Sequence, residues 1–202
     1  MKTGLSFRQV GLFKIDTSED SIRRRVEDTF HVVMRNLNDT VVSSYLGLSH
    51  LTRAGALSHH TAYSKVSFDD HLTVIWDDTY VYCHKSNDHE LQRACYSGHK
   101  SRHRVKMMSL VFLDGYVLDL IGPFYGKNND ASISSAILNT YTDLSLLCED
   151  GDVQIVDRGF CDVAQEFVAL GYDVKLPGLL SKGDKQLSTA TANESRMVTK
   201  CR

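Results

Sequence analysis

Hydrophobic positions recur with a helical period near the start of the chain. Five of them fall on one helical face: Ile22, Val26, Phe30, Val33 and Met34. Thr17 and Asp20 have the spacing of a capping box at the beginning of this segment. A shorter amphipathic pattern covers residues 6–13. The pattern therefore predicts two helices joined by a tight turn.

The pattern changes to that of β-strands after residue 70. Residues 72–76 form an apolar run, which predicts a buried strand that ends at the paired acids Asp77 and Asp78. Residues 104–113 and 116–121 are two further strand candidates, joined by a hairpin at Asp114-Gly115. The preceding segment, 45–70, is rich in Ser, Thr, His and Gly, and its weak periodicity predicts a connector with at most one short helix.

Helices and strands alternate in the last third of the chain. A helix is predicted over 129–147, with Asn129 or Asp130 as its cap, and another over 161–170. Strands are predicted at 153–156, ending at Asp157, and at 173–176. The order β-β-β-α-β-α-β indicates an α/β (α+β) fold: a mixed sheet of three meandering strands followed by a βαβ unit, flanked by helices. We expect a small N-terminal helical segment (1–44), a connector (45–70) and an α/β core (71–202).

Composition narrows the functional classes. The chain has 202 residues, 24% of them charged, with a net charge of −2, so contacts with DNA would have to come from local basic patches. The five cysteines include no close pair, which argues against a disulfide framework, and Cys83, His84, His89 and Cys95 match no standard zinc spacing. The sequence shows no apolar leader and no run of 18 apolar residues, so we expect a protein that is neither secreted nor associated with a membrane.

Two acids are candidates for a metal site. Asp77 and Asp157 each follow an apolar strand run, in segments far apart in the sequence. A half-buried carboxylate is unfavourable without a partner, and hard cations such as Mg²⁺ or Mn²⁺ prefer oxygen ligands. Such ions support phosphoryl transfer. Aspartates at strand ends also form ordinary turns, and the pattern alone leaves both interpretations open.

Two basic stretches are candidates for DNA contacts. Arg23 and Arg24 lie on the second predicted helix, which fits either a helix-turn-helix or an ordinary helical hairpin with a solvated basic face. The second stretch precedes and enters the second predicted strand, where it can contact phosphates or form a solvated flank of the hairpin. Its basic residues are Lys100, Arg102, Arg104 and Lys106.

Six segments carry a family resemblance. They are TGLSFRQV (3–10), LGLSHLTR (46–53), VIWDDTY (74–80), GPF (122–124) with NNDASI (128–133), IVDRGF (155–160) and NESRMVTK (193–200). In this order, they resemble the Harbinger-type DDE superfamily endonucleases, a transposase-derived family. The resemblance implies a ribonuclease H-like fold in which three carboxylates hold divalent metal ions for cutting and joining DNA.

The resemblance also assigns residues to the catalytic metal site. Asp77 matches the first acid and Asp157 the acid on the fourth strand, while Asp130 matches a further family aspartate and is kept as a candidate catalytic ligand. Asp78 stands where the family usually has glycine, so it would either compete for the metal or perturb its geometry. The family's third acid would lie on a helix beyond residue 202. Glu166 and Glu194 are internal substitutes without the matching context.

The sequence therefore predicts a transposase-derived, metal-dependent DNA endonuclease that binds Mg²⁺ or Mn²⁺ weakly and is inactive as it stands. The alternative is a non-catalytic remnant that binds DNA or a protein. We expect a nuclear location, or a nuclear and cytoplasmic one, with DNA and possible nuclear proteins as partners and no membrane.

Overall fold

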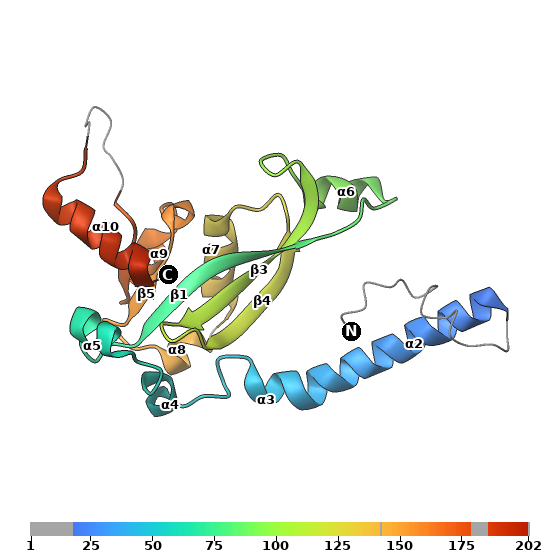
Figure 1. Cartoon of the computed structure of the whole chain (residues 1–202), viewed down its shortest axis with the longest axis horizontal. Helices are drawn as coiled ribbons and strands as arrows, with labels where there is room; N and C mark the ends of the chain where they lie inside the picture. The colour runs from blue at the N-terminus through green and yellow to red at the C-terminus, as the bar shows by residue number, and fades with distance from the viewer. Residues whose placement is uncertain (1–17, 142, 179–185, 202) are drawn as a thin grey trace. The chain divides into compact units, whose positions relative to one another are not determined.

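The computed structural model describes residues 18–141, 143–178 and 186–201 (Figure 1). The chain divides into two compact units, the first ending at Tyr45 and the second beginning at Leu46. Segment 46–70 therefore belongs to the second unit, which contains the sheet.

The first unit is helical. Helix α2 (Glu19–Leu37) continues into the π-helical turn η1 (Asn38–Val42) and the short helix α3 (Ser43–Tyr45). This confirms the longer of the two predicted N-terminal helices. The shorter one, 6–13, and the capping residue Thr17 lie outside the described residues, so the helix-turn-helix remains a prediction.

A mixed sheet forms the centre of the second unit. Its strands are β1 (Thr73–Tyr82), β2 (Tyr96–Ser97), β3 (Arg102–Phe112), β4 (Val117–Tyr125), β5 (Val153–Ile155) and β6 (Asp173–Lys175). The order is β4-β3-β1-β5-β6, and the short β2 also pairs with β3. Strands β1, β3 and β4 are antiparallel neighbours, whereas β5 runs parallel to β1 and β6 parallel to β5. The predicted meander followed by a βαβ unit is confirmed, and the arrangement is that of a ribonuclease H-like fold.

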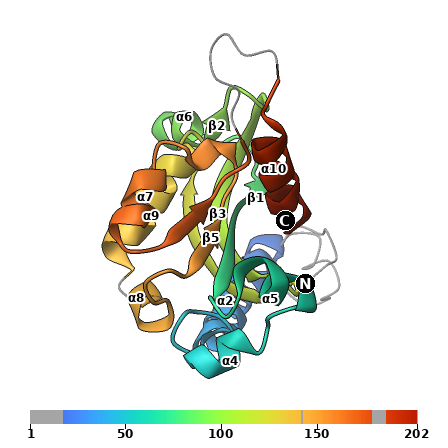
Figure 2. The ribbon, with the colours of Figure 1, turned by 90° about the vertical axis from the view of Figure 1, so that its left-hand side faces the viewer.

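Helices cover both faces of the sheet. Helices α7 (Asp130–Thr140) and α9 (Ala164–Ala169) lie on one side and α10 (Thr189–Cys201) on the other (Figure 2). The short helix α8 (Leu144–Leu147) follows α7, and the 3₁₀ turn η2 (Arg158–Phe160) precedes α9. On the α7/α9 side Trp76 packs edge-to-face on Phe167, with ring centroids 5.0 Å apart. On the other side Ile75 and Ile155 pack with Val198 of α10.

The hairpin and the helix cap follow the sequence pattern. Gly115 lies in the turn between β3 and β4 with φ +90°, a conformation that glycine adopts without strain. Asn129 is the cap of α7, because its side chain accepts a hydrogen bond from the backbone N–H of Ser132 at 2.7 Å.

The prediction of at most one helix in 45–70 was wrong. The segment contains α4 (Arg53–Leu57) and α5 (Ala62–Phe68), capped by Thr52 and Thr61. Each helix is too short to show a clear period, so its N-cap is the stronger signal. Helix α6 (His89–Cys95), capped by Asp88, was also not predicted.

The predicted end of the first strand was also wrong. Strand β1 continues through Asp77 and Asp78 to Tyr82. The reason is the long antiparallel ladder with β3, which pairs Asp77 with Ser109, Asp78 with Met108 and Tyr82 with Arg104. Backbone pairing continues where the apolar run ends, so the acids lie within the strand.

Candidate functional site

Asp77 of β1 and Asp157, which lies just beyond the end of β5, occupy matching positions along two adjacent parallel segments. Ile75 of β1 pairs with Ile155, the last residue of β5, and each aspartate lies two residues further along the chain. The backbone of Asp157 is still extended, with φ −92° and ψ −177°, so the alternation of side chains continues to this residue. Both aspartates therefore lie on the sheet face of Ile75 and Ile155, which is the face that packs with α10.

Asp157 is held by the turn that follows it. Its Oδ1 accepts a hydrogen bond from the backbone N–H of Gly159 at 2.7 Å, which caps the 3₁₀ turn η2. Asp157 is half-buried and Asp77 is exposed on the strand. The more buried of the two carboxylates, that of Asp157, is thus oriented by a backbone N–H group.

Asp78 projects from the opposite face and belongs to a different cluster. Its Oδ2 accepts a hydrogen bond from Lys106 Nζ at 2.5 Å, and the same ammonium donates to Asp130 Oδ1. The side chains of Asp78 and Lys106 are each 4% exposed and that of Asp130 is 21% exposed. A lysine therefore supplies the positive charge between these two carboxylates, as a buried acid pair requires.

The two carboxylates of this cluster differ in pKa. Burial raises the pKa of Asp78 to about 7. Burial opposes ionisation of Asp130 as well, but hydrogen bonds with Asp78 and Lys106 lower its pKa overall. Burial also acts against the charge of Lys106, yet its hydrogen bonds with Asp130 and Asp78 raise the pKa of the ammonium. Asp78 is therefore the acid of the cluster that takes up a proton near neutral pH.

Gly159 lies between the two groups of acids. A Cβ atom at this position would be 2.8 Å from Asp130 Oδ2 and 3.0 Å from Asp157 Oδ1. Asp130 thus borders Asp157 through one oxygen, while Lys106 engages the other. Within the described parts of the chain, no group of three or more His, Cys, Asp or Glu side chains is arranged to hold a metal ion. Of the three predicted ligands, Asp130 and Asp157 meet at Gly159, whereas Asp77 projects from the sheet face opposite to the cluster of Asp78 and Asp130.

The basic residues that the sequence suggested as DNA contacts lie in three different places. Lys100, Arg104 and Lys106 line a cavity of about 480 Å³ together with Asp130 and Gly159. Arg102 is exposed, and its guanidinium carbon lies 5.4 Å from the ring centroid of Tyr82. Arg23 and Arg24 are exposed on α2 of the first unit.

The two glutamates named as substitutes for the third acid are both exposed. Glu166 on α9 accepts a hydrogen bond from Ser135 Oγ at 2.8 Å, and Glu194 lies on α10. Glu166 therefore has a structural partner on the α7/α9 side of the sheet.

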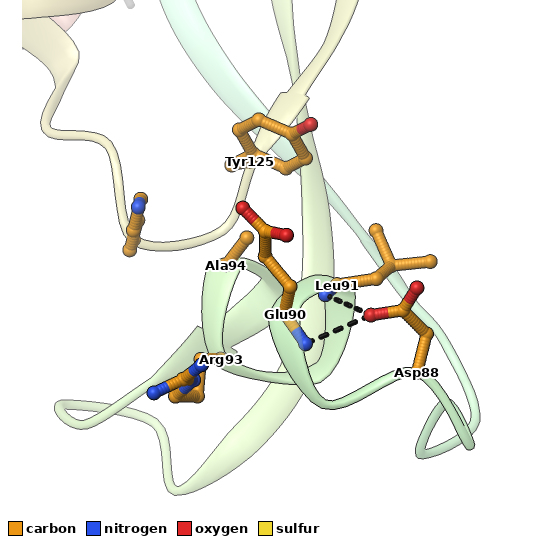
Figure 3. A pocket seen from close by; sticks show the side chains of 7 residues that line it. Asp88, Glu90, Leu91, Arg93, Ala94 and Tyr125 are labelled. Atoms are coloured by element: carbon orange, nitrogen blue, oxygen red, sulfur yellow. Dashed lines mark hydrogen bonds between the residues drawn. The ribbon is translucent and has the colours of Figure 1, made fainter.

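A larger cavity, of about 620 Å³, lies beside α6 (Figure 3). Asp88, Glu90 and Arg93 line it together with Tyr125. The carboxylate of Asp88 accepts hydrogen bonds from the backbone N–H groups of Glu90 and Leu91 at 2.8 and 3.0 Å, which accounts for its presence as a helix cap. The cavity was not predicted, because α6 was not.

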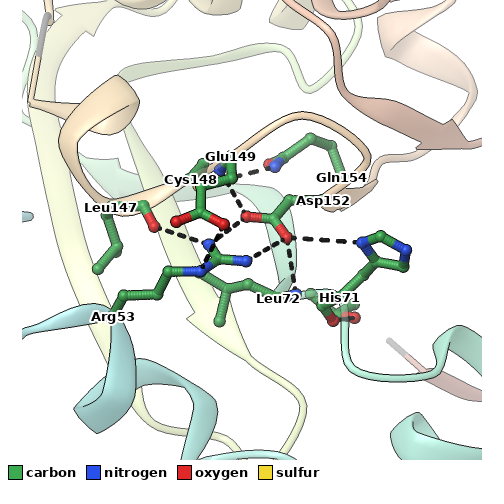
Figure 4. Close-up of polar contacts among 9 residues, drawn as sticks. Arg53, His71, Leu72, Leu147, Cys148, Glu149, Asp152 and Gln154 are labelled. Atoms are coloured by element: carbon green, nitrogen blue, oxygen red, sulfur yellow. Dashed lines mark hydrogen bonds and ion pairs between the residues drawn. The ribbon is translucent and has the colours of Figure 1, made fainter.

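The most completely buried acid, Asp152, was also missed in the sequence (Figure 4). Its carboxylate accepts two hydrogen bonds from Arg53, at 2.6 and 2.9 Å, and one each from the backbone N–H groups of Leu72 and Glu149. These bonds connect α4, the start of β1 and the turn before β5. The role of Asp152 is structural, and no local pattern distinguishes it from the acids of an ordinary turn.

The family model of the DDE superfamily endonucleases matches residues 76–202, more than half of the chain. The chain therefore belongs to the DDE superfamily endonuclease family. The matched segment contains all three predicted acids. Comparison with curated proteins and with solved structures gives no match. No helix among the described residues is both long enough and apolar enough to cross a membrane.

Proposed function

We propose that the chain is a transposase-derived, metal-dependent DNA nuclease core of the Harbinger type, in which Asp77 and Asp157 hold a divalent cation. The observation that carries this proposal is the parallel register of β1 and β5. It sets two carboxylates from distant segments at matching positions on one sheet face. Membership of the endonuclease family supports the same reaction class.

The donor set suits a hard cation. Mg²⁺ and Mn²⁺ take oxygen ligands, and Mg²⁺ is commonly held by one or two carboxylates, with water and substrate phosphates completing its coordination. Asp77 and Asp157 supply the carboxylates. The N–H of Gly159 fixes Asp157 by binding its Oδ1. Asp130 is a third candidate, and its use as a ligand requires that it share its charge between the cation and Lys106.

A bound divalent cation supplies activation of water and stabilisation of the leaving oxygen in phosphodiester hydrolysis. The protein side chains position that cation and the phosphate. Because Asp130 is committed to Lys106, we propose that this 202-residue chain binds the cation weakly and turns over DNA slowly. In other catalytic sites, groups that act as a unit lose most of the rate when one is missing.

Titration with Mn²⁺, followed by the loss of its free electron paramagnetic resonance signal, tests the proposed ligands. We expect Asp77→Asn and Asp157→Asn to weaken Mn²⁺ binding by at least about tenfold. Asp78→Asn is the matched control, since it alters the neighbouring acid on the opposite sheet face. Equal affinity in the wild type and in both ligand variants would remove Asp77 and Asp157 from the site.

A second candidate function is DNA binding without chemistry. The basic cavity beside Asp130 favours it, because phosphate contacts need no metal. An electrophoretic shift of duplex DNA that weakens as salt rises, in the absence of divalent ions, supports this function. The absence of a shift at low salt counts against it.

A further inference from the structure

The cavity beside Asp130 has more positive than negative side chains. Four cationic residues and one acid line it: Lys100, Arg104, Lys106, Lys127 and Asp130. Lys106 is paired with Asp130 and Asp78, so these groups largely compensate one another. Lys100, Arg104 and Lys127 have no ion pair within the described residues. The cavity is therefore suited to an anion.

Of the three cationic residues of the lining without an ion pair in the described part of the chain, Arg104 is the one that is buried. The residue is only 6% exposed, and its Nε and Nη1 atoms are buried without a hydrogen-bond partner in the described part of the chain. Its guanidinium carbon lies 4.0 Å from the ring centroid of Tyr80, so the aromatic ring holds the group in place. Buried donors without acceptors are costly, and a ligand that accepts from both would relieve that cost. Arginine donors match the oxygens of a phosphate group well.

Gly126 shapes the cavity next to Arg104. A Cβ atom there would be 2.4 Å from the backbone oxygen of Arg104 and 2.5 Å from that of Cys95. The absence of a side chain lets segment 126–129 pack closely on β3 while still lining the cavity. The close approach of these backbone segments therefore forms part of the cavity wall.

We propose that this cavity binds one nucleotide unit of a DNA strand, with a backbone phosphodiester on Arg104. This inference rests on the proposed function for the identity of the strand. The volume of about 480 Å³ lies within the range of roughly 300–1,000 Å³ that ligand sites occupy. Tyr96 also lines the cavity and is 44% exposed, so it offers a ring against which a base can stack.

The location connects this nucleotide with the acids. Gly159 lines the cavity, and its N–H binds the carboxylate of Asp157. A nucleotide held on Arg104 therefore lies beside the turn that orients Asp157, on the sheet face of Asp78 and not on that of Asp77. Arg104 acts as a binding residue for the strand.

Fluorescence anisotropy in EDTA tests this assignment, using the full chain and a fluorescein-labelled oligothymidylate of about twelve nucleotides. We expect Arg104→Gln to weaken binding by at least about tenfold, because two charge-assisted hydrogen bonds are lost. Arg102→Gln removes the same charge from an exposed position on the same strand and should weaken binding by less than about threefold. Equal losses in the two variants would overturn the assignment to the cavity.

A second variant tests the proposal even if Arg104→Gln does not fold. Lys100 and Lys127 are exposed, so the double variant Lys100→Gln/Lys127→Gln should keep the circular dichroism spectrum of the wild type. We expect it to bind the oligonucleotide more weakly and to reduce the slope of affinity against salt. Unchanged affinity and slope in this variant would also overturn the proposal.

Competition experiments distinguish a DNA phosphodiester from free inorganic phosphate as the group that the cavity binds. The dinucleotide TpT carries an internal phosphodiester and no terminal phosphate, and we expect it to displace the oligonucleotide. Displacement by inorganic phosphate but not by TpT would overturn the assignment to a DNA strand. Because EDTA removes divalent ions, these results do not depend on the metal site, and Mn²⁺ titration without DNA does not depend on the cavity.

Discussion

Asp77 and Asp78 are consecutive residues of β1 and project from opposite faces of the sheet. Asp77 shares the α10 face with Asp157, whereas the carboxylate of Asp78 is buried against Lys106. The family resemblance implied that Asp78 stands in place of a glycine, and the sequence left open whether it competes for metal. Its contact with Lys106 favours a structural role, since the lysine already supplies the cation that this carboxylate needs.

Protonation of Asp78 should make stability depend on pH. Its folded-state pKa is raised to about 7 from a usual value of 3.8, mainly because it is buried. The folded state therefore binds the proton more tightly, and this contribution to stability is fully present below pH 3.8 and is lost as pH rises through about 7. The lowered pKa of Asp130 acts in the opposite direction and below this window, because its contribution is lost as pH falls through the folded-state pKa.

Urea unfolding of the wild type and of Asp78→Asn between pH 4 and pH 8 measures this effect. We expect the stability of the wild type relative to the variant to fall as pH rises and to level off above the pKa of Asp78. The histidines are common to both proteins, so the difference isolates Asp78. A difference that does not vary with pH would show that Asp78 titrates normally.

Lys106→Met should destabilise the fold because it leaves the buried carboxylate of Asp78 and the partly buried carboxylate of Asp130 without their cation. We expect a loss of roughly 3 kcal/mol at pH 8, the scale for breaking a buried ion pair. The loss should be smaller at pH 5, where Asp78 can be neutral. Lys65→Met, at an exposed position of α5, is the control and should change stability by less than about 0.5 kcal/mol. Equal losses for the two variants in urea unfolding would exclude a structural role for Lys106.

Asp152→Asn tests the buried network that joins α4 to the sheet. The fully buried carboxylate has four hydrogen bonds, two of them from Arg53, so we expect a loss of roughly 3 kcal/mol in urea unfolding. Glu149 also pairs with Arg53, but its side chain is 69% exposed, so Glu149→Gln should cost less than about 1 kcal/mol. A small effect of Asp152→Asn would mean that solvent or a neighbouring group replaces these bonds.

The order of the core strands could be predicted because their apolar runs and turn residues are local signals. The hairpin at Gly115 and the cap at Asn129 followed from the residues at those positions. The extent of β1 could not be predicted, since the polar half of the strand is stabilised by pairing with β3, which is distant in sequence. For α4 and α5 the sequence predicted at most one short helix, because their lengths give too little periodicity.

The candidate site, like the fold, could be predicted from the sequence only in part. Asp77 and Asp157 were predicted as metal ligands from their positions after apolar runs, and their segments are neighbours in the sheet, with Asp157 just beyond the end of β5. The separation of Asp77 from Asp78 follows from strand alternation, once both are known to lie within β1. The burial of Lys106 and Arg104 could not be inferred, because in the sequence they belong to a basic stretch that resembles any solvated flank.

Gly159→Ala provides a sharp test of the geometry around Asp157. The added methyl group would come within 3.0 Å of carboxylate oxygens of both Asp130 and Asp157. Carboxylates can move aside at small cost to the fold, but a displaced Asp157 would no longer reach the cation that we propose it shares with Asp77. We therefore expect Mn²⁺ affinity to fall by about tenfold, as in sites whose ligands lose their orientation, with little change in urea unfolding. Gly98→Ala is the matched control, because a Cβ there meets nothing within 4 Å. If Gly159→Ala binds Mn²⁺ as tightly as Gly98→Ala, the cation does not depend on the carboxylates beside Gly159.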